Sequence, residues 1–339
     1  MKLIELFDIA IEKKASDIHL TTGQAPRFRI DGRLERTGDL APGREALREI
    51  LEPFLEHRDR GRLEEGLPVE GIMERGGIAF VGLAFRHGEG ELTTTFRLLS
   101  GGIPSLEKVG GSEQSVFEEA LKSPRGLILV TGPSMSGKWT TGCSMIEEIN
   151  RTQASRIFVV ESHPNYRWEG KESMVTPIHV GQDCDSYEQA LSNVFQSDLD
   201  VIGLDDIPSA SVLREVLSLA ETGHLVIANL HADSVTDALR RLCCGLGLDG
   251  PEIRQRLAKG FVLITSQRLF RKVGSGRTAA YEYLLPSTGA REAVARGELD
   301  EIDRLISDGV EAQSLRRSVE RLVEAGTIID EKSSALVPD

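Results

Sequence analysis

Long apolar runs are missing from this chain of 339 residues. No stretch approaches the roughly 18 consecutive apolar residues that a membrane-spanning helix requires. The first residues, MKLIELFDIAIEKK, lack the apolar segment and small-residue cleavage site of a secretory signal peptide. We therefore expect a cytoplasmic protein without direct insertion into a membrane.

Positive charge and cysteine are also scarce. Lys and Arg total 40 against 53 Asp and Glu, and the net charge of −13 argues against a general nucleic-acid-binding protein. The four cysteines, Cys143, Cys184, Cys243 and Cys244, form no C-x-x-C pair and have no metal-ligand spacing. We expect reduced thiols in packing positions, and a zinc or redox role for the adjacent Cys243 and Cys244 is the alternative.

A glycine-rich segment from Gly132 to Trp139, GPSMSGKW, is the most informative feature that is present. It matches the phosphate-binding loop pattern G-x-x-x-x-G-K-[ST] except at the last position. In such a loop, backbone N–H groups hold nucleotide phosphates, the lysine reaches the β- and γ-phosphates, and the hydroxyl binds Mg²⁺. The only polar atom of the Trp139 side chain is an N–H donor, so this side chain offers Mg²⁺ no ligand.

The sequence around this segment supports a phosphate site. Residues 126–131, GLILVT, are a short apolar run typical of a buried parallel strand, and we expect residues 140–151 to form the helix that follows. Backbone donors and the positive end of the helix dipole would then converge on one anion. A chance match in an ordinary strand-to-helix turn is the alternative. The predicted nucleotide ligands in this segment are Gly132, Pro133, Ser134, Met135, Ser136, Gly137, Lys138, Trp139 and Thr140.

Residues 1–100 carry a mixed pattern that suits a small α+β domain. The expected elements are a helix at 3–14 and strands at 17–20, 27–30 and 78–85, with a turn at Asp31-Gly32. A stretch that contains Gly and Pro, SGGIPS, indicates a linker at residues 101–106.

Beyond the linker, apolar strands alternate with helical segments, so the fold class that we expect for residues 107–290 is α/β. The predicted strands lie at 126–131, 156–162, 200–206 and 224–231. This alternation indicates a parallel sheet with helices on both faces, and such sheets bind ligands at the carboxyl ends of their strands. Residues 291–339 are charged and amphipathic, which predicts a helical C-terminal subdomain.

Candidate catalytic residues stand where the predicted strands end. Glu161 ends the second strand, Asp205 and Asp206 end the third, and His231 ends the fourth. Because parallel strands share one carboxyl edge, a nucleotide on the loop could meet all of them. An acid in this position commonly holds Mg²⁺ or orients the attacking water. For any one residue alone, a solvated charge or a helix cap is the alternative reading.

Five segments together resemble the secretion-superfamily ATPases, and among them the type IV pilus retraction ATPases of twitching motility. The segments are DIHLTTG from Asp17, RGLILVTGPSMSGK from Arg125, LDVIGLDD from Leu199, LAETGHLVIANLHADS from Leu219 and SQRLFRKVGSGRTAAYE from Ser266. The resemblance runs from about residue 3 to about residue 330 in the same order. It implies a PAS-like N-terminal domain, a RecA-like P-loop ATPase domain, six copies in a ring, and ATP or ADP held between the two domains.

The family's functional positions are only partly retained. By resemblance, Lys138 is the loop lysine, Glu161 is the acid that opens the Asp box, and His231 is the His-box histidine. Asp206 replaces the glutamate that usually ends the Walker B strand, and its shorter carboxylate could still reach Mg²⁺ through water. Arg97 matches an arginine near the domain junction, and the resemblance implies that it contacts the nucleotide.

Other positions depart from the family's pattern. Met135 stands where the loop usually has a glycine, Trp139 replaces the serine that binds Mg²⁺, and Asn165 replaces a glutamate that orients the attacking water. An amide cannot act as a general base, although it can hold a water. The stretches that match the family's γ-phosphate arginines, at 79–85 and 190–198, contain no arginine.

These departures predict a subunit with little or no ATPase activity. The loss of Mg²⁺ coordination, of the water-orienting acid or of the arginines each corresponds to about two to four decades of rate, and such losses do not add. The resemblance then implies a regulator or structural partner of the pilus motor, in a homo- or hetero-hexameric ring. Its expected partners are a pilus inner-membrane platform protein or an active paralogous ATPase, which would place the chain in the cytoplasm, peripheral to the inner membrane.

Two questions stay open at the level of sequence. An active retraction motor is the alternative function, with Arg86, His87, His163 or Arg167 in place of the missing groups. We expect Trp139 to pack under the loop, and the alternatives are that its ring fills the nucleotide pocket or stacks on a base. The sequence supports ATP or ADP as the cofactor and does not decide whether Mg²⁺ accompanies it.

Overall fold

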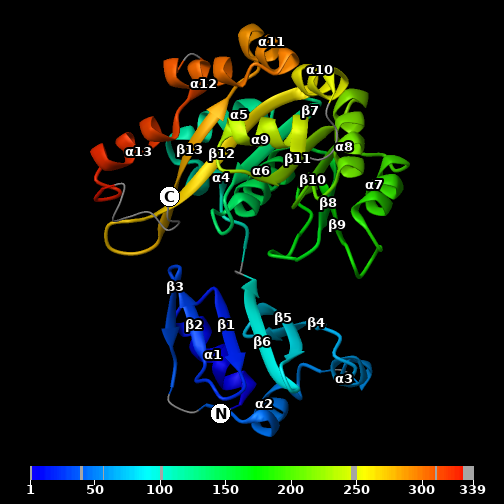
Figure 1. Cartoon of the computed structure of the whole chain (residues 1–339), viewed down its shortest axis with the longest axis vertical. Helices are drawn as coiled ribbons and strands as arrows, with labels where there is room; N and C mark the ends of the chain where they lie inside the picture. The colour runs from blue at the N-terminus through cyan, green and yellow to red at the C-terminus, as the bar shows by residue number, and fades with distance from the viewer. Residues whose placement is uncertain are drawn as a thin grey trace. The chain divides into compact units, whose positions relative to one another are not determined.

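The computed structural model describes residues 2–38, 41–55, 57–99, 102–245, 250–309 and 311–330. The chain divides into two compact units, Met1–Gly102 with Pro164–Arg167, and Ile103–His163 with Trp168–Asp339 (Figure 1). Residue 101 of the predicted linker and residues 331–339 of the predicted C-terminal subdomain lie outside the described residues.

In its described residues, the first unit is a six-stranded antiparallel sheet with three helices, in the strand order β3-β2-β1-β6-β5-β4. Its elements are α1 (Leu3–Glu12), β1 (Asp17–Thr21), β2 (Arg27–Ile30), β3 (Arg33–Arg36), α2 (Arg44–Leu51), α3 (His57–Glu64), β4 (Val69–Arg75), β5 (Ile78–His87) and β6 (Glu91–Leu99). The rings of Phe7 and Phe80 stack in its core with centroids 3.9 Å apart. Asp31 and Gly32 both have positive φ, at 46° and 78°, as a two-residue hairpin turn requires. The predicted α+β character and the predicted turn are confirmed.

The second unit contains an eight-stranded sheet in the order β14-β13-β12-β7-β11-β10-β8-β9. Its strands are β7 (Gly126–Gly132), β8 (Arg156–Glu161), β9 (Met174–His179), β10 (Val201–Leu204), β11 (Leu225–His231), β12 (Phe261–Arg271), β13 (Arg277–Leu284) and β14 (Ala312–Gln313). The four predicted strands, β7, β11, β10 and β8, are adjacent and mutually parallel. The fold class expected from the sequence is therefore confirmed.

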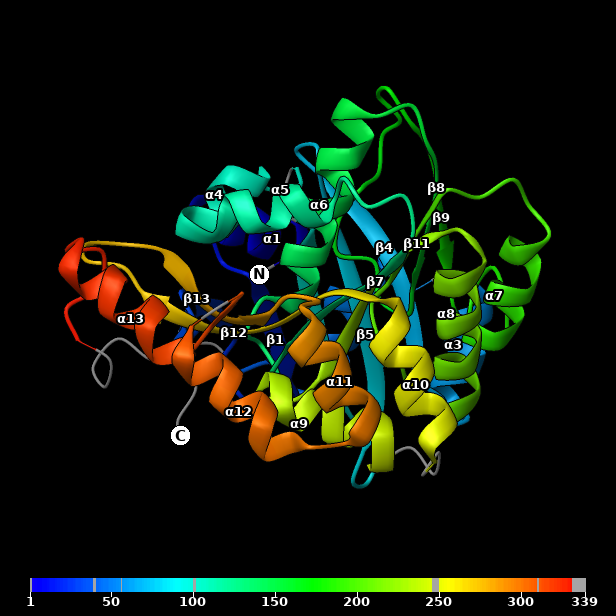
Figure 2. The same ribbon diagram turned by 90° about the horizontal axis from the view of Figure 1, so that it is seen from above.

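Helices cover both faces of this sheet. They are α4 (Leu106–Gly110), α5 (Gln114–Ala120), α6 (Lys138–Thr152), α7 (Tyr187–Phe195), α8 (Ala210–Thr222), α9 (Val235–Arg240), α10 (Pro251–Gly260), α11 (Thr288–Arg296), α12 (Leu299–Asp308) and α13 (Leu315–Glu324). Figure 2 shows α4, α5 and α6 on one side of the sheet and α8, α10 and α11 on the other. Every residue of β7 is buried between these layers, which explains its continuous apolar sequence.

The C-terminal helices join the second unit in two ways. Residues of α11 and α12, including Ala293 and Ile302, belong to the main apolar core that also contains Leu127 and Leu129 of β7. Helix α13 packs instead on a small separate cluster in which Val319 contacts residues of β12 and β13. Among the helices of the described ranges, none combines the length and apolarity needed to cross a membrane.

Three of the four cysteines can be placed. The side chains of Cys143, Cys184 and Cys243 are buried, in agreement with the expected packing role. The side chain of Cys244, which the alternative zinc or redox role needs, lies outside what the structure describes.

Candidate nucleotide-binding site

The loop between β7 and α6 has the backbone of a phosphate-binding turn. Gly132, Met135 and Gly137 take positive φ angles of 148°, 63° and 83°. A Cβ atom at Gly132 would lie 2.5 Å from the Gln267 carbonyl oxygen and 2.5 Å from Ser136 Oγ, so only glycine fits there. Met135 takes the left-handed conformation without the freedom of glycine, and its backbone is therefore strained.

Two buried polar side chains belong to this site. One of them fixes the loop by a hydrogen bond, and the other offers a donor to an anion. The Gln267 side chain, on β12, donates a hydrogen bond from Nε2 to the Ser136 carbonyl oxygen at 2.6 Å. Ser136 is fully buried, and its hydroxyl has no hydrogen-bond partner among the described residues. An orphaned hydroxyl beside the first turn of a 15-residue helix is a donor that a phosphate oxygen would satisfy. The residues present therefore fit a nucleotide phosphate group.

Lys138 is the first residue of α6 and lies over the loop. Its Nζ donates to the Pro133 carbonyl oxygen at 2.8 Å and contacts Nδ1 of His231 at 3.2 Å. Burial lowers the pKa of Lys138 to about 8, and the nearby Asp206 carboxylate partly opposes this shift. The ammonium group is thus held in a partly dehydrated position beside the loop.

Asp206 and His231 are electrostatic neighbours of Lys138. Burial raises the pKa of Asp206, while the charges of His231 and Lys138 act in the opposite direction. Loss of water around the His231 ring lowers its pKa, and the Lys138 charge lowers it further. Arg241, which the sequence analysis did not select, donates to the His231 backbone carbonyl. Three residues predicted from separate segments are therefore brought together at the loop.

Trp139 lies in the first turn of α6 with only 9% of its surface exposed. Its Nε1 donates to Oε2 of Glu161 at 3.0 Å. Gly142 leaves room for the ring, because a Cβ atom there would lie 3.2 Å from the indole. At Gly203 a Cβ atom would lie 3.4 Å from the indole, an ordinary contact, and 2.3 Å from Cδ1 of Ile146. The indole therefore fills the space between α6 and β10, as the packing interpretation expected. Its donor faces a carboxylate, so position 139 does not fit Mg²⁺.

Glu161, at the end of β8, is fully buried. One carboxylate oxygen accepts the Trp139 hydrogen bond, and the other lies 3.8 Å from Nε2 of His179 on the neighbouring strand β9. The backbone N–H of His179 donates to Asp183 at 2.8 Å, which holds this strand end. The predicted catalytic acid is therefore enclosed in an internal polar cluster.

Asp205 joins three elements behind the strand ends. Its Oδ2 accepts hydrogen bonds from the Ser162 backbone N–H at 2.8 Å and the Ser162 hydroxyl at 3.0 Å. The Tyr187 hydroxyl, on α7, donates to its other oxygen. Burial raises the pKa of Tyr187 far above its usual range, so the phenol stays a donor. Asp205 is a structural acceptor, and of the two adjacent aspartates only Asp206 is grouped with Lys138.

Arg97 and Asn165 belong to the first unit. Arg97 lies on β6, with 55% of its side chain exposed, and its Nε donates to Oδ1 of Asp17 at 3.1 Å. Asn165 falls in the short segment Pro164–Arg167 that is grouped with that unit. Within one unit, the structure therefore brings neither residue together with the loop, and the predicted contact of Arg97 with nucleotide stays a prediction.

The four candidates for compensation make local contacts or are exposed. Arg86 donates from Nη1 to the Glu64 carbonyl oxygen at 2.7 Å, and His163 contacts the Ser162 hydroxyl at 3.0 Å. The Arg167 side chain is 79% exposed, and His87 is also exposed. Their geometry gives none of them a phosphate-directed position within the described part of either unit.

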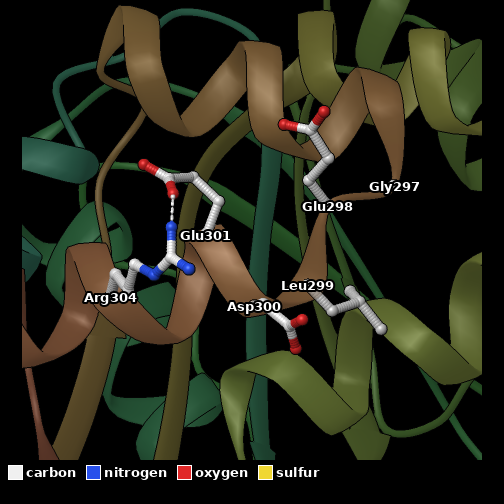
Figure 3. Close-up of a pocket in the computed structure, with 6 residues that line it drawn as sticks. All are labelled: Gly297, Glu298, Leu299, Asp300, Glu301 and Arg304. Carbon is white, nitrogen blue, oxygen red and sulfur yellow. Dashed lines mark hydrogen bonds and ion pairs between the residues drawn. The ribbon is translucent and has the colours of Figure 1, made fainter.

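A separate surface pocket of about 440 Å³ lies where α11 meets α12 (Figure 3). It is lined by Gly297, Glu298, Leu299, Asp300, Glu301 and Arg304. The guanidinium of Arg304 pairs with Glu301 at 3.0 Å, which leaves an acidic rim. Because this rim would repel phosphates, the pocket is not a second nucleotide site.

The sequence of this chain is similar to those of known proteins. The sequence profile of the type II/IV secretion system proteins matches residues 91–332. The chain is 28% identical to the type IV pilus retraction ATPase PilT of Pseudomonas aeruginosa, covering 100% of this chain and 99% of that protein. It is also 28% identical to a twitching motility protein of Neisseria gonorrhoeae, covering 94% of this chain and 87% of that protein.

A solved structure gives the same result. The crystal structure of the pilus retraction motor PilT with bound ADP superposes with a TM-score of 0.84 at 32% identity, covering 97% of this chain and 94% of that one. The predicted resemblance to pilus retraction ATPases is therefore confirmed along the whole chain.

Proposed function

Since the chain belongs to the type II/IV secretion system protein family and is PilT-like throughout, we propose that it is a subunit of a type IV pilus machine that binds nucleotide but hydrolyses ATP slowly or not at all. It acts as a regulator or structural partner of the retraction motor. The ligand is ATP or ADP, in line with the ADP in the PilT structure.

One observation carries the loss of activity, namely the hydrogen bond from Trp139 to Glu161. The indole of Trp139 stands in place of a metal-binding hydroxyl. Its hydrogen bond also occupies the carboxylate of Glu161, the acid that would otherwise face the reaction. Asn165 adds to the loss, because an amide cannot accept the proton of an attacking water. Each such loss corresponds to about two to four decades of rate.

Nucleotide binding is the part of the activity that we propose is kept. The loop retains Gly132 and Gly137 at positions with positive φ, the unpartnered Ser136 hydroxyl and the ammonium of Lys138. These groups recognise phosphate through backbone donors, a hydroxyl and one cation, and none of them requires a bound metal.

The assembly belongs to the same proposal. We propose a PAS-like domain at 1–100, a linker at 101–106, an ATPase domain at 107–290 and a helical subdomain at 291–339. Six such chains, alone or mixed with an active paralogous ATPase, form a ring that meets a pilus inner-membrane platform protein from the cytoplasm. A particle that stays monomeric at high concentration with and without ADP, and that captures no pilus protein, would contradict this assembly.

A working retraction motor is the second candidate function, and the grouping of Lys138, Asp206 and His231 favours it. A steady-state ATPase assay of the full chain with Mg²⁺ separates the two candidates. We expect no turnover above background. The variants are Lys138→Ala and, as a matched control, Lys108→Ala, which removes an exposed lysine of α4. Turnover that persists in Lys108→Ala and disappears in Lys138→Ala would overturn the proposal of lost hydrolysis.

A further inference from the structure

The loop fits a nucleotide phosphate group, but Trp139 does not fit the magnesium ion that usually accompanies it. We infer that the chain binds a nucleoside diphosphate without magnesium. This inference rests on the proposed function only in that the loop binds nucleotide at all. It goes further by stating that the nucleotide is a diphosphate and that its binding does not need Mg²⁺.

The diphosphate position follows from the donors that are present. The α6 N-terminus, the Ser136 hydroxyl and Lys138 Nζ converge on the loop, and Gly132 leaves no side chain in the way. Ser136 is fully buried, and its hydroxyl, which has no partner among the described residues, would gain one in a phosphate oxygen. The site is built for an anion independently of any metal.

The contacts of the Trp139 side chain leave no magnesium ligand at position 139. Its one polar hydrogen is donated to Glu161 at 3.0 Å, and its ring packs closely on Gly142. A cation held at this position would meet an N–H donor and an aromatic ring edge instead of an oxygen ligand. Magnesium added to the nucleotide therefore gains no protein ligand from position 139.

The missing hydroxyl at position 139 also bears on the number of phosphates. Asp206 follows the end of β10, which pairs in parallel with β11, and β11 ends at His231, which contacts Lys138 Nζ at 3.2 Å, so Asp206 lies at the same edge of the sheet as the loop. A metal ion would normally shield such an acid from a γ-phosphate. Without that shield, the additional charge of a triphosphate meets the Asp206 carboxylate directly, which disfavours ATP relative to ADP.

Binding measured by calorimetry on the full chain tests the inference, with ADP and ATP each in Mg²⁺ and in EDTA. We expect the ADP dissociation constants with and without Mg²⁺ to agree within about threefold, and ATP in EDTA to bind about three- to tenfold more weakly than ADP. ADP affinity that rises more than about tenfold with Mg²⁺ would overturn the metal-free site. ATP that binds as tightly as ADP in EDTA would overturn the preference for the diphosphate.

Variants assign the effect to residues. Lys138→Ala should abolish ADP binding in EDTA, and the control Lys108→Ala should not. Trp139→Ser restores a hydroxyl and should make ADP binding about tenfold tighter in Mg²⁺ than in EDTA. If this variant folds and stays indifferent to Mg²⁺, Trp139 is not the cause. Trp139→Phe keeps a ring without an oxygen, so its ADP binding should stay independent of Mg²⁺ even if the serine variant does not fold.

Fluorescence gives a second readout of the same site. The chain has two tryptophans, so in a Trp168→Phe background Trp139 is the one indole that reports on the loop. ADP in EDTA should change its emission with the dissociation constant found by calorimetry, and unchanged emission at saturating ADP would contradict binding at this loop. Metal-dependent binding without turnover would sink this inference and leave the proposed function standing, whereas Lys138-dependent turnover would sink the proposed function itself.

Discussion

The phosphate loop and the acids at the ends of β8 and β10 lie in one unit, and their polar groups are used differently. In the loop, the Ser136 hydroxyl has no partner among the described residues, and Lys138 lies over the loop in a partly dehydrated position. At the strand ends, the Glu161 carboxylate accepts from Trp139, and Asp205 accepts from Ser162 and a tyrosine. One region is available to a ligand, and the other is part of the protein's internal hydrogen bonding.

This difference teaches how a nucleotide-binding fold can separate binding from hydrolysis. Donors that are unsatisfied or dehydrated oppose folding until a ligand meets them, whereas satisfied acids stabilise the fold and are withdrawn from chemistry. Substitutions at the strand ends should therefore destabilise the protein. Substitutions of Lys138 and Met135 in the loop should leave stability unchanged or raise it.

The largest effect is expected for Trp139→Ser. The indole is buried between α6 and β10, and its removal leaves a cavity and an enclosed carboxylate. We expect the free energy of unfolding to fall by about 3–5 kcal/mol, measured by urea denaturation without nucleotide. Trp168→Phe is the control, since it removes the chain's other indole. A loss below about 1 kcal/mol would show that Trp139 is not a packing residue and would break the comparison.

A smaller loss is expected for Trp139→Phe, which keeps a ring and deletes the N–H donor. Glu161 would then lose the partner of a buried carboxylate oxygen, and stability should fall by about 1–3 kcal/mol. The same change in a Glu161→Gln background should be less harmful by about 1 kcal/mol, because a neutral amide needs the donor less. Equal losses in the two backgrounds would mean that the hydrogen bond contributes nothing beyond shape.

The parts of this site that sequence could predict are local ones. The apolar run of β7, the glycines of the loop and the acids after the strands are short-range patterns, and the structure places them as expected. Strands β9, β12 and β14 were not predicted. β9 contains Pro177 and is only partly buried, β14 has two residues, and polar residues interrupt β12, so none of the three is a continuous apolar run.

The use of the acids could not be predicted, because it depends on contacts between distant segments. The Trp139 hydrogen bond spans 22 residues of sequence, and the Gln267 bond to the loop spans 131. One signal was available and was missed. Gly142 inside a helix and Gly203 inside a buried strand are unfavourable choices unless a bulky neighbour needs the space, and that neighbour is the indole at Gly142 and Ile146 at Gly203.

Lys138→Met tests the loop side of the comparison through pH. Because burial lowers the pKa of Lys138 to about 8 from 10.5, both the folded and unfolded chains carry the charge below pH 8, and burying it opposes folding. The variant should be more stable than the parent by about 1–2 kcal/mol at pH 7, allowing for partial exposure. Between the folded and unfolded pKa values the unfolded parent binds more protons, so the parent's stability rises with pH and the advantage shrinks.

Paired urea denaturation curves at pH 7 and pH 10 measure that advantage, with Lys108→Met as the exposed control. An advantage that is the same at both pH values would mean that the charge of Lys138 is not its cause. A variant less stable than the parent at pH 7 would mean that the bond from Lys138 to the Pro133 carbonyl outweighs the loss of hydration. Either result would mean that the Lys138 charge does not oppose folding, so the loop would no longer differ from the strand ends in this respect.

The smallest effect is expected for Met135→Gly. Met135 is 59% exposed and has a φ of 63°, so its side chain contributes little packing while its backbone is held in the left-handed region. Relief of about 1–2 kcal/mol of strain is offset by the larger conformational entropy of glycine, and the net gain in stability should be about 0.5–1 kcal/mol. Met135→Ala keeps the strain and should leave stability unchanged in the same denaturation series. If glycine instead destabilises the protein, the methionine side chain has a packing role. The loop would then contribute to stability, as Glu161 and Asp205 do, and the comparison between the two regions would fail.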